Sequence, residues 1–157
     1  VASKRKFKFY DTFGKTTFHE AYSAKELDGA YHRQVSNLAS LILKNDGGNT
    51  FVSQELPKEA QLAPINAINT TDVNNDGFPD MLIAGNSNAQ ESSRGNYDAS
   101  YGLLLIYQPQ TSLYEAIGSG ESGIHLTGTV QQLLPISETS ILVLKNDDYP
   151  EVIRVSK

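Results

Sequence analysis

The clearest chemical signal in the sequence is a short segment in which oxygen-bearing side chains recur at fixed spacing. Aspartate or asparagine stands at positions 1, 3, 5 and 9 of the segment Asp72-Val73-Asn74-Asn75-Asp76-Gly77-Phe78-Pro79-Asp80. In a calcium loop of this kind, position 7 contributes its backbone carbonyl and a glycine at position 6 permits a sharp turn. Three carboxylates suit Ca²⁺ better than Mg²⁺, which tends to keep several of its waters. The sequence therefore predicts a bound Ca²⁺ with five ligands: Asp72, Asn74, Asp76, the carbonyl of Phe78, and Asp80.

The loop is not an EF-hand, because position 12 is Ile83 inside an apolar run rather than a glutamate. The alternative to a metal site is an Asx-rich turn without an ion, since Asp, Asn and Gly favour turns by themselves. A related segment follows later in the chain, beginning at Asn146-Asp147. There the positions matching Asp72 and Asn74 are Val143 and Lys145, so the sequence predicts that this second turn binds no metal.

The elements that would position the loop are short β-strands. After residue 30, apolar runs alternate with Gly, Asn, Asp and Pro, which is typical of a sandwich, barrel or propeller. A turn at Asn45-Asp46-Gly47-Gly48 predicts a hairpin, and residues 16–30 predict one or two turns of helix. Ten strands are expected: Tyr31–Asn37, Ala39–Lys44, Thr50–Glu55, Ile65–Asp72, Met81–Asn86, Gly102–Tyr107, Ser112–Ile117, Gly128–Pro135, Ser140–Lys145 and Glu151–Ser156.

The charge and amino-acid composition of the chain exclude several classes of function. The net charge of -5 and the single basic cluster near the start of the chain argue against a nucleic-acid partner. The absence of cysteine excludes disulfides, thiol catalysis and cysteine-ligated zinc. The longest apolar stretch, Leu103 to Tyr107, is far shorter than the roughly 20 residues of a transmembrane helix. Since Val1 opens the chain without a start methionine, we expect a piece of a longer protein.

A long polar insertion between two predicted strands, Ser87 to Gly102, is a second candidate site. Long loops at one end of a β-scaffold often bind ligands, and aromatic and arginine side chains are favoured anchors there. The alternative is that the tyrosines fold back over the sheet while the charged residues pair locally. The ligand-binding candidates are Arg94, Tyr97, Asp98 and Tyr101.

The calcium loop followed by Leu82-Ile83-Ala84-Gly85-Asn86 resembles an FG-GAP/VCBS repeat, the blade unit of integrin-type propellers. Most of the chain between Thr12 and Val155 is similar to the C-terminal propeller segment of bacterial VCBS proteins that carry an ASPIC/UnbV domain. The resemblance implies an all-β fold: a partial β-propeller of about two to three antiparallel four-stranded blades, spanning residues 30–157, after an N-terminal segment 1–29 with a short helix. It also implies a calcium-stabilised, extracytoplasmic protein, secreted or outer-membrane-anchored at full length, with no established catalytic activity.

Three functional readings follow from these features. The first is a non-catalytic binding or scaffolding module for a glycan or protein partner, which would pack against the remaining blades of its parent protein. The second is a portion of a carbohydrate-active hydrolase that uses acidic loop residues, with Asp98 and Glu121 as a candidate acid–base pair. The third is an assembly module, because the unpaired edge strands of an incomplete propeller invite self-association.

Overall fold

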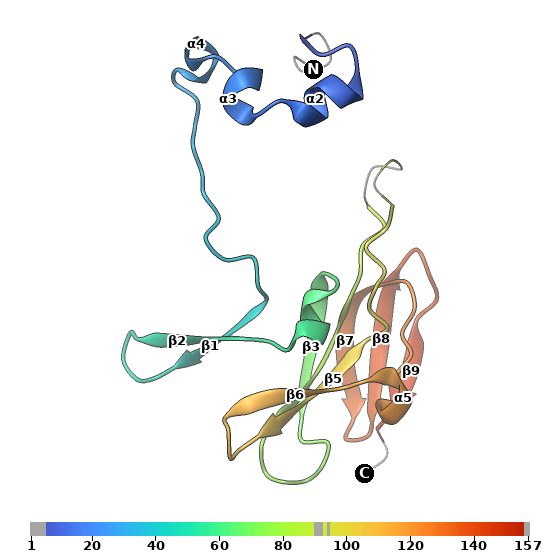
Figure 1. The fold of residues 1–157 in the computed structure, drawn as a ribbon. Helices are drawn as coiled ribbons and strands as arrows, with labels where there is room; N and C mark the ends of the chain where they lie inside the picture. Colours follow the sequence, from blue (N-terminus) through green and yellow to red (C-terminus); the bar gives the residue numbers. More distant parts are fainter. Residues whose placement is uncertain (1–5, 90–92, 94, 156–157) are drawn as a thin grey trace. The chain divides into compact units, whose positions relative to one another are not determined.

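The computed structural model describes residues 6–89, 93 and 95–155, and the chain divides into two compact units, Val1–Leu38 and Ala39–Lys157 (Figure 1). The first unit contains short helices and the second contains β-sheets. In neither unit does a described helix have the length and hydropathy needed to cross a membrane.

The first unit is held by helix caps rather than by a core. Its described residues include the short helices α2 (Tyr10–Lys15), α3 (Phe18–Ala21) and α4 (Ala24–Leu27). The last two confirm the helical prediction for residues 16–30, whereas α2 was not predicted. Ala21 is the one buried hydrophobic residue in its described part, while Phe18 remains 54% exposed. The described contacts of this unit are therefore hydrogen bonds, ion pairs and ring contacts such as that of Phe18 with Tyr22, rather than a buried core.

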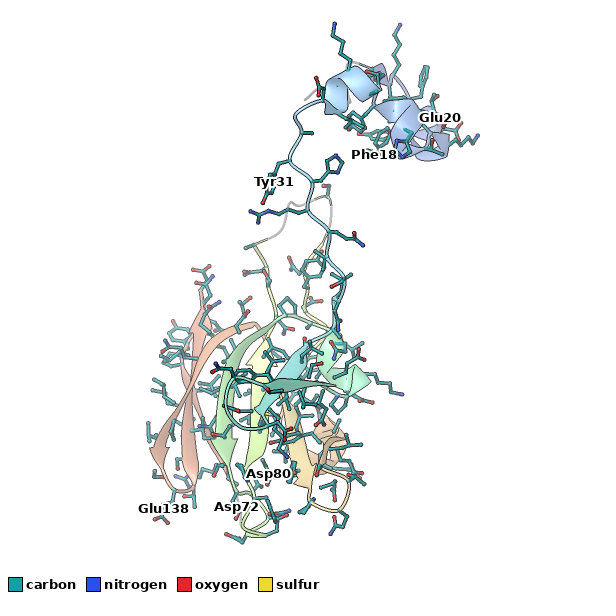
Figure 2. All side chains as sticks on the ribbon, turned by 90° about the vertical axis from the view of Figure 1, so that its left-hand side faces the viewer. Phe18, Glu20, Tyr31, Asp72, Asp80 and Glu138 are labelled. Carbon is teal, nitrogen blue, oxygen red and sulfur yellow. The ribbon has the colours of Figure 1, made fainter. Side chains whose placement is uncertain are left out.

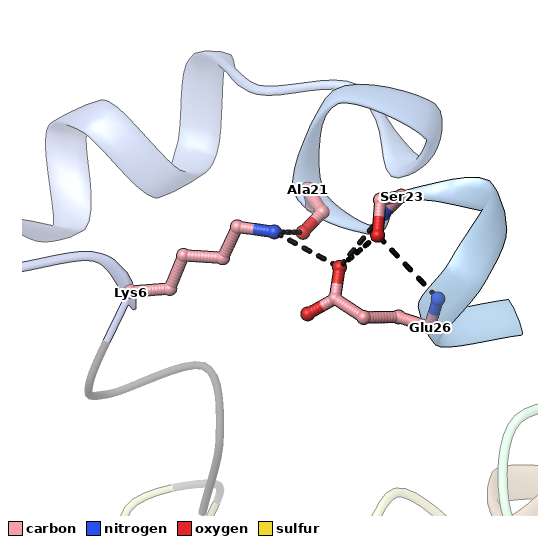
Figure 3. Close-up of polar contacts among 4 residues, drawn as sticks. All are labelled: Lys6, Ala21, Ser23 and Glu26. Carbon is pink, nitrogen blue, oxygen red and sulfur yellow. Dashed lines mark hydrogen bonds and ion pairs between the residues drawn. The ribbon is translucent and has the colours of Figure 1, made fainter.

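Those local bonds centre on two glutamates that cap α3 and α4. The Glu20 carboxylate accepts hydrogen bonds from Thr17 N and Oγ1 at 2.9 and 2.8 Å, and Glu26 accepts from Ser23 N and Oγ, both at 2.8 Å. Such reciprocal caps satisfy N–H groups that a helix leaves unpaired at its start. Figure 3 shows that the Lys6 ammonium also reaches Glu26 Oε2, at 3.3 Å.

These contacts predict an unusually acidic carboxyl group. The backbone N–H and hydroxyl of Ser23, and then Lys6, lower the pKa of Glu26 from 4.5 to about 2. The depressed pKa means that the capping interaction is fully present above pH 4.5 and is lost as the pH falls toward 2. We expect an NMR titration of the full chain to give this low pKa, and Ser23→Ala to move it back toward 4.5. A wild-type Glu26 titrating at its ordinary pKa would contradict the capping geometry.

The second unit contains three antiparallel sheets (Figure 1). A two-stranded sheet is formed by β1 (Leu41–Asn45) and β2 (Phe51–Glu55). A four-stranded sheet follows in the order β3 (Ile65–Thr71), β4 (Asp80–Gly85), β5 (Leu103–Gln108) and β6 (Leu113–Ile117). A three-stranded sheet comprises β7 (Thr129–Ser137), β8 (Ser140–Asn146) and β9 (Glu151–Arg154). The short helical turns η1 (Lys58–Gln61) and α5 (Ser119–Ser122) lie between strands.

This architecture confirms an all-β body and the hairpin at Asn45–Gly48. Nine of the ten expected strands are present. The expected strand Tyr31–Asn37 is wrong, since that segment has neither helix nor strand and leaves Tyr31 and Val35 81% and 68% exposed. A strand requires a hydrogen-bonding neighbour. Instead Arg33 lies over the Tyr31 ring, 4.8 Å from its centroid.

Two apolar clusters cover both faces of the four-stranded sheet. Toward the three-stranded sheet, the buried residues are Ala67, Leu82, Ala84, Leu126, Val130, Leu133, Ile141 and Val143. On the opposite face, they are Ala60, Ile83, Leu103 and Leu105. Because alternate side chains of β4 enter different clusters, this strand must be apolar on both faces. The double burial explains the uninterrupted run Leu82-Ile83-Ala84 directly after the predicted calcium loop.

Candidate metal centre

The predicted calcium loop joins β3 to β4 and is bent by two residues with positive φ. These are Asn75, at 60°, and Gly77, at 87°. Gly reaches this region without steric cost and Asn tolerates it better than most residues. Figure 2 shows Asp72 at the start of the loop and Asp80 at the start of β4. The two positive-φ positions of the loop are thus occupied by Asn and Gly, the residue types that favour turns.

Asp72, Asn74 and Asp76 are brought together inside the loop. Oδ1 of Asp72 and Oδ1 of Asn74 both accept a hydrogen bond from Asp76 N, each at 3.1 Å, so these two oxygens converge on one N–H group. Asp72 Oδ2 accepts from Gly77 N at 2.9 Å, and Asp76 Oδ1 accepts from Phe78 N at 2.9 Å. The loop's own amides, together with Asn74 Nδ2, which donates to Asp76 Oδ2 at 2.9 Å, thus orient these oxygens.

Asp80 occupies a different environment, because its side chain is completely buried. Its Oδ2 accepts from Val73 N at 3.0 Å and its Oδ1 from Tyr107 N on β5 at 2.9 Å. Within residues 6–89, 93 and 95–155, no basic side chain forms an ion pair with it. A buried charge without a cation is expensive. Asp80 therefore fixes the loop to β5 through two backbone N–H groups, and its carboxylate has no ion-pair partner among the described residues.

The donor set of the loop fits a hard cation. No three carboxylate or imidazole groups in the described part of the chain are gathered as a preformed metal cluster. A carboxylate or amide oxygen that accepts one N–H group nevertheless retains a lone pair for another partner. The three aspartates and Asn74 thus keep free acceptor capacity of the type that calcium prefers. The hydrogen bonds in the loop order these oxygens without exhausting them.

Next to the turn between β8 and β9, a lysine of β8 stands at the position that matches a proposed metal ligand in the sequence alignment. Aligned on the shared Asn-Asp, Lys145 stands where Asn74 does, and Glu151 stands where Asp80 does. The Lys145 side chain is 5% exposed, with its Nζ 2.8 Å from Glu151 Oε1 and 3.9 Å from Asp148 Oδ2. The contact with Glu151 is an ion pair rather than a well-directed hydrogen bond. An ammonium therefore balances the acidic groups of this turn.

The two related turns do not occupy equivalent joints in their sheets. The predicted calcium loop connects the edge strand β3 to β4, whereas the second turn connects the central strand β8 to the edge strand β9. The two turns are therefore similar in local sequence and in their acidic residues, but not in their position within a sheet.

A cluster of aromatic rings borders the loop on the β5–β6 side. The Phe78 and Tyr107 ring centroids are 5.5 Å apart, and those of Tyr107 and Tyr114 are 5.1 Å apart. Tyr114 donates its hydroxyl to the carbonyl of Pro79 at 3.2 Å. Burial, together with the charges of Tyr107 and Asp80, raises the pKa of the Tyr114 phenol above its ordinary value.

This raised pKa has a measurable consequence for stability. The unfolded phenol ionises near pH 10 and the folded one only at higher pH, so stability falls as the pH rises from 10 through the folded-state value. We expect Tyr114→Phe to flatten this alkaline decline in urea unfolding, and Tyr149→Phe, at an 88% exposed position, to preserve it. Equal slopes for the wild type and Tyr114→Phe would contradict the assignment.

The polar insertion is held at its base by backbone hydrogen bonds, and its candidate ligand-binding side chains make different contacts from one another. Tyr97 exchanges two backbone hydrogen bonds with Ser87, at 2.8 and 2.9 Å, and is 49% exposed. Tyr101 stacks on His125, with centroids 4.5 Å apart. Asp98 is exposed, and Arg94 lies outside the described residues. Among the described residues of the insertion, no hydrogen bond, ion pair or ring contact joins these candidate side chains to one another, so the insertion stays a predicted ligand site.

A buried asparagine that the sequence did not single out anchors this insertion. Asn86, 4% exposed with φ of 73°, donates to the carbonyls of Ser100 and Gly128 at 2.7 and 3.1 Å and accepts from Ser100 N. Its own carbonyl accepts from Asn66 Nδ2, which also donates to Val130. The only sequence signal was an Asn at the end of an apolar strand, which a turn explains equally well.

Comparison of the chain with protein-family models, with curated proteins and with solved structures gave no significant match. The likeness to FG-GAP/VCBS repeats therefore stays a hypothesis that rests on the loop, the strand after it and the turn pattern.

Proposed function

We propose that this chain is a calcium-stabilised, non-catalytic binding or scaffolding module for a glycan or protein partner. The observation that carries the proposal is Asp80, a fully buried carboxylate beneath a loop whose remaining oxygens come from Asp72, Asn74 and Asp76. A buried carboxylate costs free energy unless hydrogen bonds and a cation compensate it, and calcium would supply that cation. The Lys145 ammonium in the related turn supports this, because there the same kind of position is filled by a cation from the chain itself.

The propeller architecture belongs to this proposal. The meander β3-β4-β5-β6 has the strand number and order of a propeller blade, and its two faces are covered as a blade's faces are by its neighbours. The hairpin β1–β2 and the sheet β7–β9 would be parts of adjacent blades, completed by the remaining blades of a parent protein. The free edges of the two-stranded sheet would support self-association. An extracytoplasmic location, secreted or outer-membrane-anchored, fits a loop that requires millimolar calcium.

Calcium, when bound, would supply a divalent charge that holds oxygen ligands together. The chain's own contribution is to orient those ligands: Asp72 and Asn74 through the amide of Asp76, and Asp80 through Val73 and Tyr107. The carbonyl of Phe78 is the fifth proposed ligand. The role is structural, joining the β3–β4 loop to β5.

Isothermal titration of the chain with calcium tests this proposal. We expect one site on the wild type and its loss in Asp76→Ala, because position 5 of the loop then lacks an oxygen. Asp147→Ala changes the matching aspartate of the β8–β9 turn and serves as the control, with binding retained. Saturable binding that survives Asp76→Ala unchanged would place calcium elsewhere.

A further inference from the structure

An aromatic pocket lies between the β1–β2 hairpin, the calcium loop and the β5–β6 hairpin. Its volume is about 300 Å³, at the lower end of the range for small-molecule sites. The apolar part of its lining comes from Ile42, Phe78, Pro79, Tyr107 and Tyr114. These residues belong to three separate parts of the chain, the β1–β2 hairpin, the β3–β4 loop and the β5–β6 hairpin, so the fold and not a local motif builds the pocket.

The aromatic part of the lining is ordered. Tyr107 lies between Phe78 and Tyr114, with interplanar angles of 36° and 61°. The Tyr114 hydroxyl is already bonded to Pro79, and Phe78 leaves 42% of its surface exposed. The pocket therefore offers a fixed surface of ring faces and edges to a ligand with an apolar face.

Three polar groups complete the lining: Lys44, Gln54 and Ser112. Alternation along β1 places Lys44 on the same face of the hairpin as Ile42, and Gln54 pairs directly with Ile42 across the two strands. In the part of the chain that the structure describes, Lys44 has no ion-pair partner, and no carboxylate lines the pocket. The site is thus aromatic with a positive rim.

We propose that this pocket binds an acidic pyranose, the uronic-acid unit of a glycan. The C–H face of the sugar ring would lie against the aromatic rings, the carboxylate would pair with Lys44, and the ring hydroxyls would bond Gln54 and Ser112. An aromatic carboxylate would satisfy Lys44 but leave the other two polar groups unpaired, which costs affinity. This inference names the partner class and rests on the proposed role as a binding module, but it does not use the metal ligands' side chains.

The test is an NMR titration of the full chain, in saturating calcium, with glucuronate, glucose and benzoate as probes. We expect glucuronate to bind most tightly and to shift the resonances of the Tyr107 and Tyr114 rings. Lys44→Gln should weaken glucuronate binding about fivefold and leave glucose unaffected, as removal of a partly exposed ion pair does. Lys58→Gln, at a side chain 91% exposed, is the matched control and should bind as the wild type does.

A second variant tests whether the aromatic rings contact the sugar. Phe78→Ala removes an exposed ring while retaining the backbone carbonyl, and should weaken both sugars. Equal affinity for glucose and glucuronate, tighter binding of benzoate, or no saturation by any probe would each overturn the inference. If the chain binds calcium but not glucuronate, the pocket proposal is wrong and the metal-site proposal stands. If the chain does not bind calcium, the metal-site proposal is wrong.

Discussion

Replacing Asp80 with alanine should lower the free energy of unfolding by about 3 kcal/mol, even with calcium chelated. The side chain is fully buried, and its removal leaves the amides of Val73 and Tyr107 without their acceptor. Each unpaired buried donor costs roughly 1–3 kcal/mol, and the empty volume adds to that loss. The effect is large because one carboxylate joins the β3–β4 loop to β5.

Urea unfolding of the full chain in chelator measures this loss without any contribution from the metal. Asp98→Ala, which removes an exposed carboxylate from the insertion, is the control and should change stability by less than about 0.5 kcal/mol. A loss below about 1 kcal/mol for Asp80→Ala would show that the two amides find other acceptors.

The second large effect is expected at Gly85, where alanine should cost about 3 kcal/mol or more. A Cβ at this position would lie 1.9 Å from Pro64 O and 2.9 Å from Asn66 N. Both are backbone atoms, so no side-chain rotation relieves the clash. The Pro64 carbonyl also accepts from Asn86 N at 3.1 Å, and moving it would disturb the bond at the base of the insertion.

Gly120→Ala is the matched control, because its Cβ would meet nothing within 4 Å. We expect this variant to unfold at the wild-type urea concentration, within experimental error, and Gly85→Ala to unfold at a clearly lower one. Similar midpoints for the two glycine variants would mean that β3 and β4 separate easily at the bulge between Ile65 and Ala67.

The sequence allowed the strands and the loop to be predicted because their signals are local. Short apolar runs separated by Gly, Asn, Asp and Pro mark the strands, and the ligand spacing of Asp72 to Asp80 lies within nine consecutive residues. The strand predicted at Tyr31–Asn37 is wrong for the opposite reason. Its residue types suit a strand, but whether a strand forms depends on a second strand elsewhere in the fold, which the local sequence does not reveal. The helix α2, with Gly14 inside it and no buried residue, carries no periodic signal.

The remaining features depend on contacts between distant segments. The approach of Pro64 to Gly85, the network around Asn86, and the pocket that combines Ile42 with Tyr114 all join residues that no short motif connects. Lys145 is an intermediate case. Its alignment with Asn74 indicated that the second turn lacks a metal ligand, but only the fold shows its ammonium against Glu151.

The most direct test of the calcium site is thermal unfolding with calcium titrated against chelator, on the wild type and on Asp76→Ala. At 100 times the dissociation constant, binding adds roughly 2.7 kcal/mol, which for a chain of this size raises Tm by about 5 to 10 °C. We expect that rise in the wild type and no rise in Asp76→Ala, whatever its starting Tm. A Tm that calcium leaves unchanged in both proteins would show that the segment from Asp72 to Asp80 is a turn without a metal, and would contradict the account.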